Sequence, residues 1–187
     1  GAFGRLLIAP VLNRANAAMN ARVREALDLR PGDRVLEVGF GGGALLRDLA
    51  GRHPGATLHG ADFSRDMARL VRRSLGRLHL ACASVQALPY ADGAFDWICT
   101  VNTLYFWPDP AAGLAELRRV LGRGGRLLIG IGDADAMRKQ AVTSVGFTLY
   151  AAADVQRMLE AAGFVNTAVT PGRDGVGSFS IIAGSKL

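Results

Sequence analysis

The chain has 187 residues, of which half are hydrophobic and a fifth are charged. This size and composition are typical of one soluble globular domain, and we expect a single domain over residues 1–187 because no low-complexity linker divides the chain. The formal charge of +6 comes almost wholly from arginine. Because the arginines are dispersed along the sequence, they argue against a nucleic-acid partner. No apolar run has the length of a membrane span, and no signal peptide is recognisable.

The two cysteines, Cys82 and Cys99, lie in apolar runs typical of strands. We expect two buried free thiols, which fits the reducing cytoplasm. The three histidines are scattered, so no cysteine–histidine spacing indicates a metal site, and we predict none.

Taken in chain order, the apolar patterns alternate between helix and strand. A helix is predicted over residues 11–29, where it is closed by the turn-forming "RPGD". Strands are predicted at residues 34–39, 57–63, 78–83, 95–101 and 126–132. Further helices are predicted at residues 43–52, 65–75, 110–121 and 151–164.

The end of the chain no longer alternates strand and helix. Two strands, at residues 165–171 and 177–184, are joined by the turn "GRDGVG", which predicts an antiparallel hairpin. The earlier strands are nearly continuous apolar runs, as in parallel sheets with helices on both faces. We therefore predict an α/β fold with a doubly wound, mostly parallel seven-stranded sheet and a C-terminal antiparallel hairpin.

The stretch "VLEVGFGGG" (residues 35–43) joins the first strand to the helix that follows it. In a doubly wound sheet, ligands bind outside the carboxyl ends of the strands. The glycines let a ligand approach the backbone closely. Asp62, at the end of the second strand, can accept hydrogen bonds from both hydroxyls of a ribose. The sequence thus predicts a nucleotide site.

An NAD(P)-binding oxidoreductase is one alternative, because "GFGGGA" satisfies the G-x-G-x-x-A pattern of dinucleotide sites. Three features argue against it. Glu37, two residues before Gly39, suits a ligand with an ammonium group, whereas a dinucleotide site usually has an apolar residue there. No Y-x-x-x-K hydride-transfer motif is present. The tail ends in a hairpin, where a dinucleotide fold continues with parallel crossovers.

Six motifs are informative through their order and spacing in the chain. They are "VLEVGFGGG", "GADFS", "ALPYADGAFDWI", "LYFWPDP", "ELRRVLGRGGRLLI" and "LEAAGF". Together they resemble class I S-adenosylmethionine (SAM)-dependent methyltransferases, and are most similar to the ubiquinone/menaquinone-biosynthesis C-methyltransferases. The resemblance runs from about Pro31 to the end of the chain. It implies a Rossmann-like methyltransferase fold, SAM as cofactor, and methyl transfer to a small-molecule or lipid-like acceptor by in-line displacement.

The resemblance also implies a set of cofactor-binding residues. They are Glu37, Gly39, Gly41 and Gly43 at the methionine end, Asp62 at the ribose, Phe63, Ser84 and Val85 at the adenine, and Thr100 near the amino group. Ser84 is a departure, because relatives carry an aspartate there for the adenine amino group, and a hydroxyl gives no charge assistance. This departure is the ground for a second alternative, a degenerate SAM-binding regulatory protein.

The segment "VNTLYFW" after the fourth strand supplies the candidate catalytic residues, Asn102 and Tyr105, which would orient a nucleophile or transfer a proton. Packing at the sheet edge is an equally good interpretation of the aromatic residues. The segment lacks the prolines with which amino-methylating nucleic-acid enzymes grip a flipped base.

The resemblance implies that residues 1–30 form a helical lid over a SAM-binding core at residues 31–187. Asn16, Met19 and Asn20 would share one face of this lid and its polar residues would face the site, although a plain surface helix is as good an interpretation. The short link between the fifth strand and the last helix, residues 133–150, predicts an open cleft. We expect a monomer or homodimer in the cytoplasm.

Overall fold

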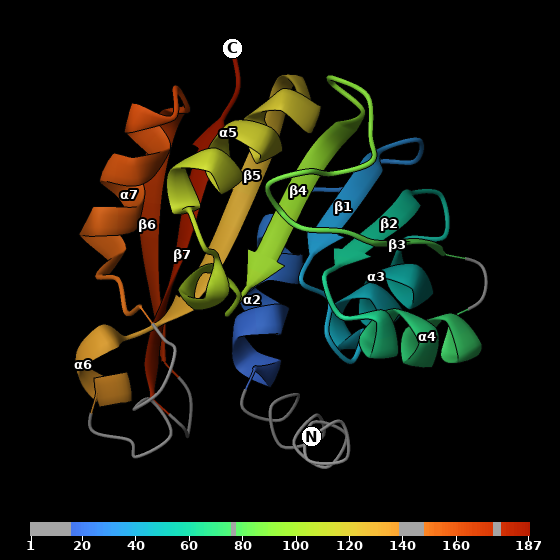
Figure 1. Ribbon diagram of the computed structural model, residues 1–187, viewed down its shortest axis with the longest axis horizontal. Helices are drawn as coiled ribbons and strands as arrows, with labels where there is room; N and C mark the ends of the chain where they lie inside the picture. Colours follow the sequence, from blue (N-terminus) through green and yellow to red (C-terminus); the bar gives the residue numbers. More distant parts are fainter. Residues whose placement is uncertain (1–15, 76–77, 139–147, 174–176) are drawn as a thin grey trace.

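A computed structural model describes residues 16–75, 78–138, 148–173 and 177–187. Its centre is a seven-stranded sheet in the order β3-β2-β1-β4-β5-β7-β6 (Figure 1). The strands are β1 (Arg34–Val38), β2 (Thr57–Asp62), β3 (His79–Cys82), β4 (Phe95–Val101), β5 (Leu121–Gly132), β6 (Val165–Arg173) and β7 (Ser178–Ser185). Neighbouring strands from β3 to β5 pair in parallel, and β7 pairs antiparallel with β5 and β6. The predicted fold class is therefore confirmed.

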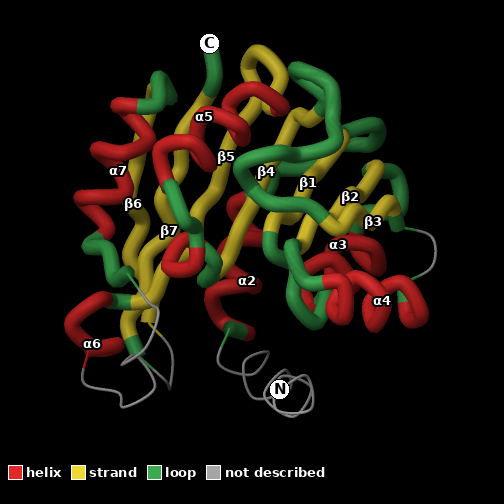
Figure 2. Tube along the Cα trace, in the orientation of Figure 1, coloured by secondary structure: helices red, strands yellow, loops and turns green. Residues whose placement is uncertain are grey.

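Helices flank this sheet, as the red and yellow segments of Figure 2 show. They are α2 (Ala17–Ala26), α3 (Ala44–Arg52), α4 (Arg65–Ser74), α5 (Pro110–Val120), α6 (Ala134–Arg138) and α7 (Ala152–Ala161), with the 3-10 turn η1 (Leu104–Phe106) after β4. Local chemistry places several helix starts. The Ser64 hydroxyl accepts a hydrogen bond from the Met67 N–H, and the Asp109 carboxylate accepts one from the Ala112 N–H, so both residues cap the helices that follow them.

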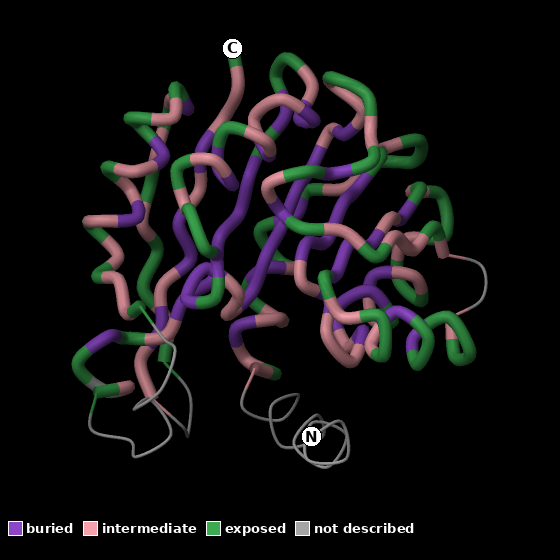
Figure 3. The backbone as a smooth tube through the Cα atoms, viewed as in Figure 1, coloured by how far each residue is buried: buried purple, intermediate pink, exposed green. Residues whose placement is uncertain are grey.

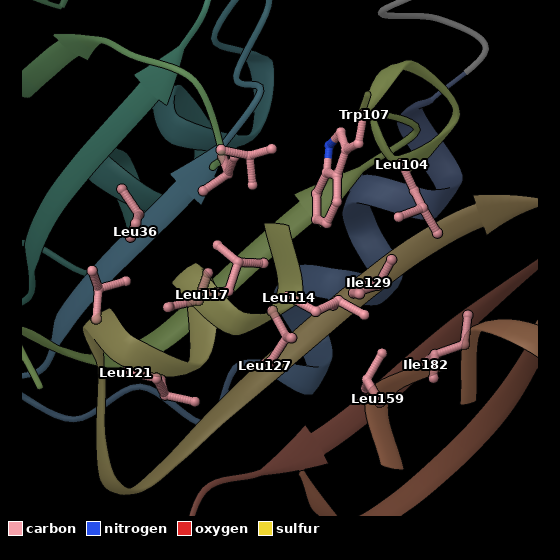
Figure 4. Close-up of a cluster of buried hydrophobic side chains, with 14 of the residues drawn as sticks. Leu36, Leu104, Trp107, Leu114, Leu117, Leu121, Leu127, Ile129, Leu159 and Ile182 are labelled. Carbon is pink, nitrogen blue, oxygen red and sulfur yellow. The ribbon is translucent and has the colours of Figure 1, made fainter. Parts of the chain in front are cut away.

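Successive side chains of a strand point to opposite faces of the sheet, and this alternation builds two hydrophobic cores. Leu36 and its neighbours pack against α5 and α7, as Figure 4 shows for Leu114, Leu117 and Leu159. Val35 belongs to the second core, which includes side chains from α2, α3 and α4. Burial is concentrated in the central strands (Figure 3), which gives the residues at their ends a rigid support.

The strand order contains a switch point. From β1 the chain continues to β2 and β3 on one side, and then crosses to β4 on the other side of β1. The connections leaving β1 and β4 therefore diverge, which opens a crevice at the carboxyl ends of these two strands.

Several sequence expectations need adjustment. β5 begins at Leu121, earlier than the predicted residue 126, because Leu121 already pairs with Phe95 of β4 before an irregularity in the register. Cys82 is exposed, contrary to expectation, because β3 is an edge strand, whereas Cys99 is buried as expected; both thiols are free. The short helix α6 lies in the link after β5 and was not predicted.

The first helix is described from Ala17 to Ala26. Residues 1–15, which include the start of the predicted helix and half of the expected lid, lie outside the described residues. The same holds for residues 139–147 of the link between β5 and α7.

Candidate functional site

A cavity of about 600 Å³ lies at the carboxyl ends of β1, β2 and β4, within the size range of small-molecule and cofactor sites. Its walls come from the loop after β1, the start of α4, the loops after β3 and β4, and α2. The lining residues used below are Asn16, Asn20, Glu37, Gly39, Gly41, Asp62, Phe63, Ser84, Val85, Asn102, Thr103, Phe106, Trp107 and Pro108. Glu37 and Asp62 are the two charged side chains among the residues that line this cavity.

Glu37 lies on β1 and is only 4% exposed. Its Oε2 accepts no hydrogen bond from any described residue. Burial raises the pKa of this carboxyl to about 8, the nearby Asp62 charge adds to the increase, and the backbone N–H of Leu46 opposes it. A buried acid with an unpartnered oxygen at a cavity wall is costly unless a donor or a cation enters the cavity.

The glycine loop after β1 allows close approach but offers few free donors. Gly39 and Gly41 both have positive φ angles, of 73° and 48°. The N–H of Gly39 already donates to the Ala61 carbonyl at 2.7 Å, and the N–H of Gly41 donates to Asp62 Oδ2 at 2.8 Å. Pyrophosphate sites use such N–H groups to hold anionic oxygens. Here both N–H groups already donate to acceptors within the protein, and the acids Glu37 and Asp62 lie nearby. These two N–H groups are therefore not available to a ligand.

Asp62 is held rigidly at the end of β2. Its Oδ2 accepts the Gly41 N–H, and its Oδ1 accepts the Ser64 N–H, each at 2.8 Å. Burial raises the pKa of Asp62, while these two backbone hydrogen bonds lower it. Each oxygen keeps a further lone pair, so the carboxylate can accept two hydroxyl protons from a ligand. Phe63, the next residue, is 73% exposed at the cavity wall.

Ser84 and Val85 line the cavity from the loop after β3. The Ser84 hydroxyl accepts a hydrogen bond from the Gln86 N–H at 3.2 Å, which shapes a tight turn. One lone pair and the hydroxyl proton remain for a ligand. Val85 is buried and contributes apolar surface.

Asn102 follows β4 in a left-handed conformation, with a φ of 54°. Such a conformation is uncommon outside glycine, but asparagine adopts it more readily than most residues. Its Oδ1 accepts hydrogen bonds from the Tyr105 hydroxyl at 3.1 Å and from the Gly132 N–H at 3.2 Å. Its Nδ2 donates to Asn16 Oδ1 at 2.7 Å. The side chain lines the cavity in a fixed orientation.

Tyr105 lies behind Asn102 and is not among the cavity-lining residues. It is 3% exposed and packs in the core with α5 and α7. Its hydroxyl accepts the Gly132 N–H at 2.6 Å, and burial raises its pKa to about 12. This position suits a residue that orients Asn102, and the raised pKa is unsuited to a base near neutral pH.

Gly43 and Thr100 also support the wall without lining the cavity. A Cβ on Gly43 would lie 2.9 Å from Val71 Cγ1, so helix α4 packs directly on the loop backbone there. The fully buried Thr100 hydroxyl donates to the Val38 carbonyl at 2.8 Å and also hydrogen-bonds to Thr103. These contacts tie β4 to the end of β1.

The sequence placed the substrate contact in the segment of residues 101–107 but did not single out Phe106 and Trp107, and Pro108 lies just beyond it; all three line the cavity. Phe106 is 54% exposed. The signal for them was their position directly after β4, but which aromatic residue faces the cavity depends on the 3-10 turn η1.

In the described part of the chain, no group of three histidine, cysteine or acidic residues is arranged to hold a metal. The described helices include none with the length and apolarity of a transmembrane segment.

Comparison with known proteins gives a consistent result. The sequence profile of a family described as the methyltransferase domain matches residues 36–129. Methyltransferase GfsG of Streptomyces halstedii is 39% identical over 124 residues, covering 63% of this chain and 44% of the relative. A demethylmenaquinone methyltransferase of Corynebacterium urealyticum is 40% identical over 108 residues, covering 58% of this chain and 45% of the relative. Each match thus spans less than half the length of the curated relative.

Among solved structures, a SAM-dependent methyltransferase from Aquifex aeolicus superposes with a TM-score of 0.75. The match covers 92% of this chain and 93% of the other, at 22% sequence identity, and it establishes the shared fold. The comparisons support neither of the two alternatives drawn from the sequence, the dinucleotide oxidoreductase and the degenerate regulatory protein.

Proposed function

Because the chain belongs to the methyltransferase domain family, whose methyl donor is SAM, we propose that it holds SAM in the cavity at the β1–β4 switch point. There it would transfer the methyl group to an apolar small-molecule or lipid-like acceptor. The observation that carries the proposal is Glu37, a buried carboxyl with an unpartnered oxygen at the cavity wall. An ammonium group supplies both the hydrogen-bond donor and the positive charge that this acid lacks.

The described residues fit this cofactor. The methionine ammonium would satisfy Oε2 of Glu37 and favour its ionised form, and Asp62 would accept the two ribose hydroxyls. Phe63, Ser84 and Val85 would surround the adenine. When bound, SAM supplies a methyl group on a positively charged sulfur, which a correctly aligned nucleophile displaces.

The acceptor would enter beside Phe106, Trp107 and Pro108, which give this wall an apolar character. Asn102 is the polar side chain placed to orient it, because its amide is fixed by Gly132 and Tyr105. Tyr105 would act as a positioning residue, since it reaches the cavity only through Asn102. An apolar wall with one oriented amide favours an uncharged aromatic or lipid-like acceptor.

The remaining features of the proposal follow from the sequence. Residues 1–30 would form the lid of a single domain, which is consistent with the cavity-lining positions of Asn16 and Asn20. We expect the protein to act in the cytoplasm as a monomer or homodimer.

Turnover is the direct test of this function. The purified chain would be incubated with SAM and a panel of apolar phenols, quinols and lipid-linked acceptors, and formation of S-adenosylhomocysteine would be measured by mass spectrometry. We expect product with at least one acceptor and little with charged analogues. If S-adenosylhomocysteine binds but no acceptor is methylated, a regulatory SAM-binding protein becomes the better account. Binding of NADH alone would reject the proposal.

A further inference from the structure

We propose that Glu116 and Arg119 of α5 are positioning residues for the bound cofactor. Their side chains hold the backbone of Leu88, and through it the loop after β3 that presents Ser84 and Val85 to the cavity. Neither of the two side chains lines the cavity itself, so both would act on a ligand only through this loop. The inference rests on the proposed function, which assigns Ser84 and Val85 to the adenine of SAM.

Side chains of α5 hold both backbone polar groups of Leu88. Its N–H donates to Oε1 of Glu116 at 2.7 Å, and its carbonyl accepts a hydrogen bond from Nη2 of Arg119 at 3.2 Å. The two side chains are themselves joined, since Nε and Nη2 of Arg119 donate to the Glu116 carboxylate at 2.7 and 2.8 Å. A bidentate pair of this kind fixes the relative orientation of both groups. Leu88 is thus clamped between two groups that hold each other.

Arg119 also anchors the end of the loop that leads into β4. Its Nη1 donates to Oδ1 of Asp92 at 2.6 Å, and its backbone carbonyl accepts the Gly93 N–H at 3.0 Å. Figure 1 shows this loop, in green, crossing over β1 and β4 on its way to the start of β4. One arginine therefore ties two further points of the loop to the same helix.

The clamp at Leu88 reaches the cavity through a single tight turn. The Ser84 carbonyl accepts the Ala87 N–H at 3.1 Å, so Leu88 directly follows a turn that begins with Ser84. Val85 lies inside this turn and packs on α5, where a Cβ atom on Gly113 would lie 3.4 Å from Val85 Cγ1. A displacement of Leu88 would therefore move the Ser84 hydroxyl and the Val85 side chain together.

The clamp depends on a sheltered charge. The Glu116 side chain is only 14% exposed. The hydrogen bond from Arg119 lowers the pKa of this carboxyl and the Leu88 N–H adds to the decrease, while burial opposes it. Without Glu116, the Leu88 N–H would lose a charged acceptor, whereas the Leu88 carbonyl would keep a hydrogen bond from the Tyr90 N–H at 2.8 Å. We therefore expect Glu116 to be the stronger of the two positioning residues.

A double-mutant cycle distinguishes positioning from general stabilisation. S-adenosylhomocysteine would be titrated calorimetrically into the full chain, Ser84→Ala, Glu116→Ala and the double variant. Each single variant should weaken binding about fivefold, because each takes the Ser84 hydroxyl from the adenine, one by removal and one by displacement. The double variant should lose about five- to tenfold, in place of the roughly 25-fold loss of two independent sites. Arg119→Ala would enter the same cycle, so that the result does not depend on one variant being folded.

Two control variants accompany the cycle. Glu116→Gln keeps an oxygen that can accept the Leu88 N–H, so it should bind S-adenosylhomocysteine within about twofold of the native chain. Arg157→Ala breaks another pair of an arginine and an acid three residues apart, with Asp154 on the exposed face of α7, and should bind normally. Circular dichroism and urea denaturation would verify that each variant is folded.

Losses that multiply in the double variant would overturn the inference, because Glu116 would then act independently of Ser84. Native affinity in both Glu116→Ala and Arg119→Ala would overturn it as well, as would native affinity in Ser84→Ala. If the native chain itself does not bind S-adenosylhomocysteine, the proposed function fails, and this outcome is distinguishable because it is seen before any variant is compared.

Discussion

A Cβ atom on Gly39 would lie 2.3 Å from Cγ2 of Thr103. The loop after β1 and the segment after β4 are therefore in direct contact at the point where the cavity opens, with no room for a side chain between them. Thr103 is held in turn by the Trp107 indole N–H, which donates to its hydroxyl at 3.2 Å. Gly39 and Thr103 both line the cavity, so this contact fixes how closely two of its walls approach.

Gly39→Ala tests this contact. The new Cβ would meet Thr103 and would also impose a positive φ on alanine, so we expect a loss of about 2–4 kcal/mol in the free energy of unfolding. Gly41→Ala is the matched control, because Gly41 has a positive φ but open space around it. It should lose only about 1–2 kcal/mol. Urea denaturation of both variants measures the difference, and equal losses would show that the contact with Thr103 is unimportant.

Asp62→Ala should weaken SAM binding at least tenfold, because the variant removes an acceptor for the ribose hydroxyls and frees the N–H groups of Gly41 and Ser64. Calorimetric titration measures the affinity, and a thermal melt verifies the fold. Asp66→Ala, in the exposed first turn of α4, is the control and should bind normally. Native affinity in Asp62→Ala would remove the ribose contact from the account.

Tyr105→Phe should lower turnover several-fold while SAM affinity stays within twofold. The hydroxyl holds Oδ1 of Asn102 at 3.1 Å, and its removal leaves this oxygen with only the longer Gly132 hydrogen bond, while Nδ2 keeps its hydrogen bond to Asn16. Steady-state kinetics and calorimetry separate the two effects. Tyr90→Phe is the control, since Tyr90 packs on His59 and Phe95 in a separate aromatic cluster. Native turnover in Tyr105→Phe would remove the positioning role.

Glu37→Gln should stabilise the ligand-free protein at high pH. The folded carboxyl has a pKa of about 8, above its ordinary value of 4.5, so the folded state keeps a proton that the unfolded state releases between these values. Stability contributed by Glu37 is therefore present below about pH 4.5 and is lost as the pH rises toward 8. Between pH 5.5 and 8 the native chain should lose about 2–3 kcal/mol more than the variant, measured by urea denaturation. Parallel pH profiles would mean that Glu37 is ionised in the folded protein.

Much of this organisation was predictable from local chemistry. Ser64 indicated the start of α4, and the end of the second strand indicated where the Asp62 carboxylate lies, because both depend on residues close in sequence. Tyr105, Phe106 and Trp107 were harder to assign. They are consecutive, and a single 3-10 turn buries Tyr105 in the core, leaves Phe106 exposed at the cavity wall and places Trp107 between the core and the cavity.

Long-range relationships were not predictable from the sequence. The hydrogen bond between Asn102 and Asn16 joins residues 86 positions apart, and it depends on the crossover that brings β4 beside α2. The unpartnered oxygen of Glu37 is likewise a property of the assembled cavity. The motif indicated an acid, whereas only the fold establishes that the acid is buried without a partner.

The central claim is that Glu37 receives the ammonium group of SAM, and proton release on binding tests it most directly. S-adenosylhomocysteine would be titrated calorimetrically at pH 7 in buffers of different ionisation enthalpy. Because the free carboxyl has a pKa of about 8 and the bound one should be ionised, the native chain should release about 0.9 proton per ligand. Glu37→Gln should release almost none and bind more weakly. No proton release from the native chain, or equal release from both proteins, would contradict the account.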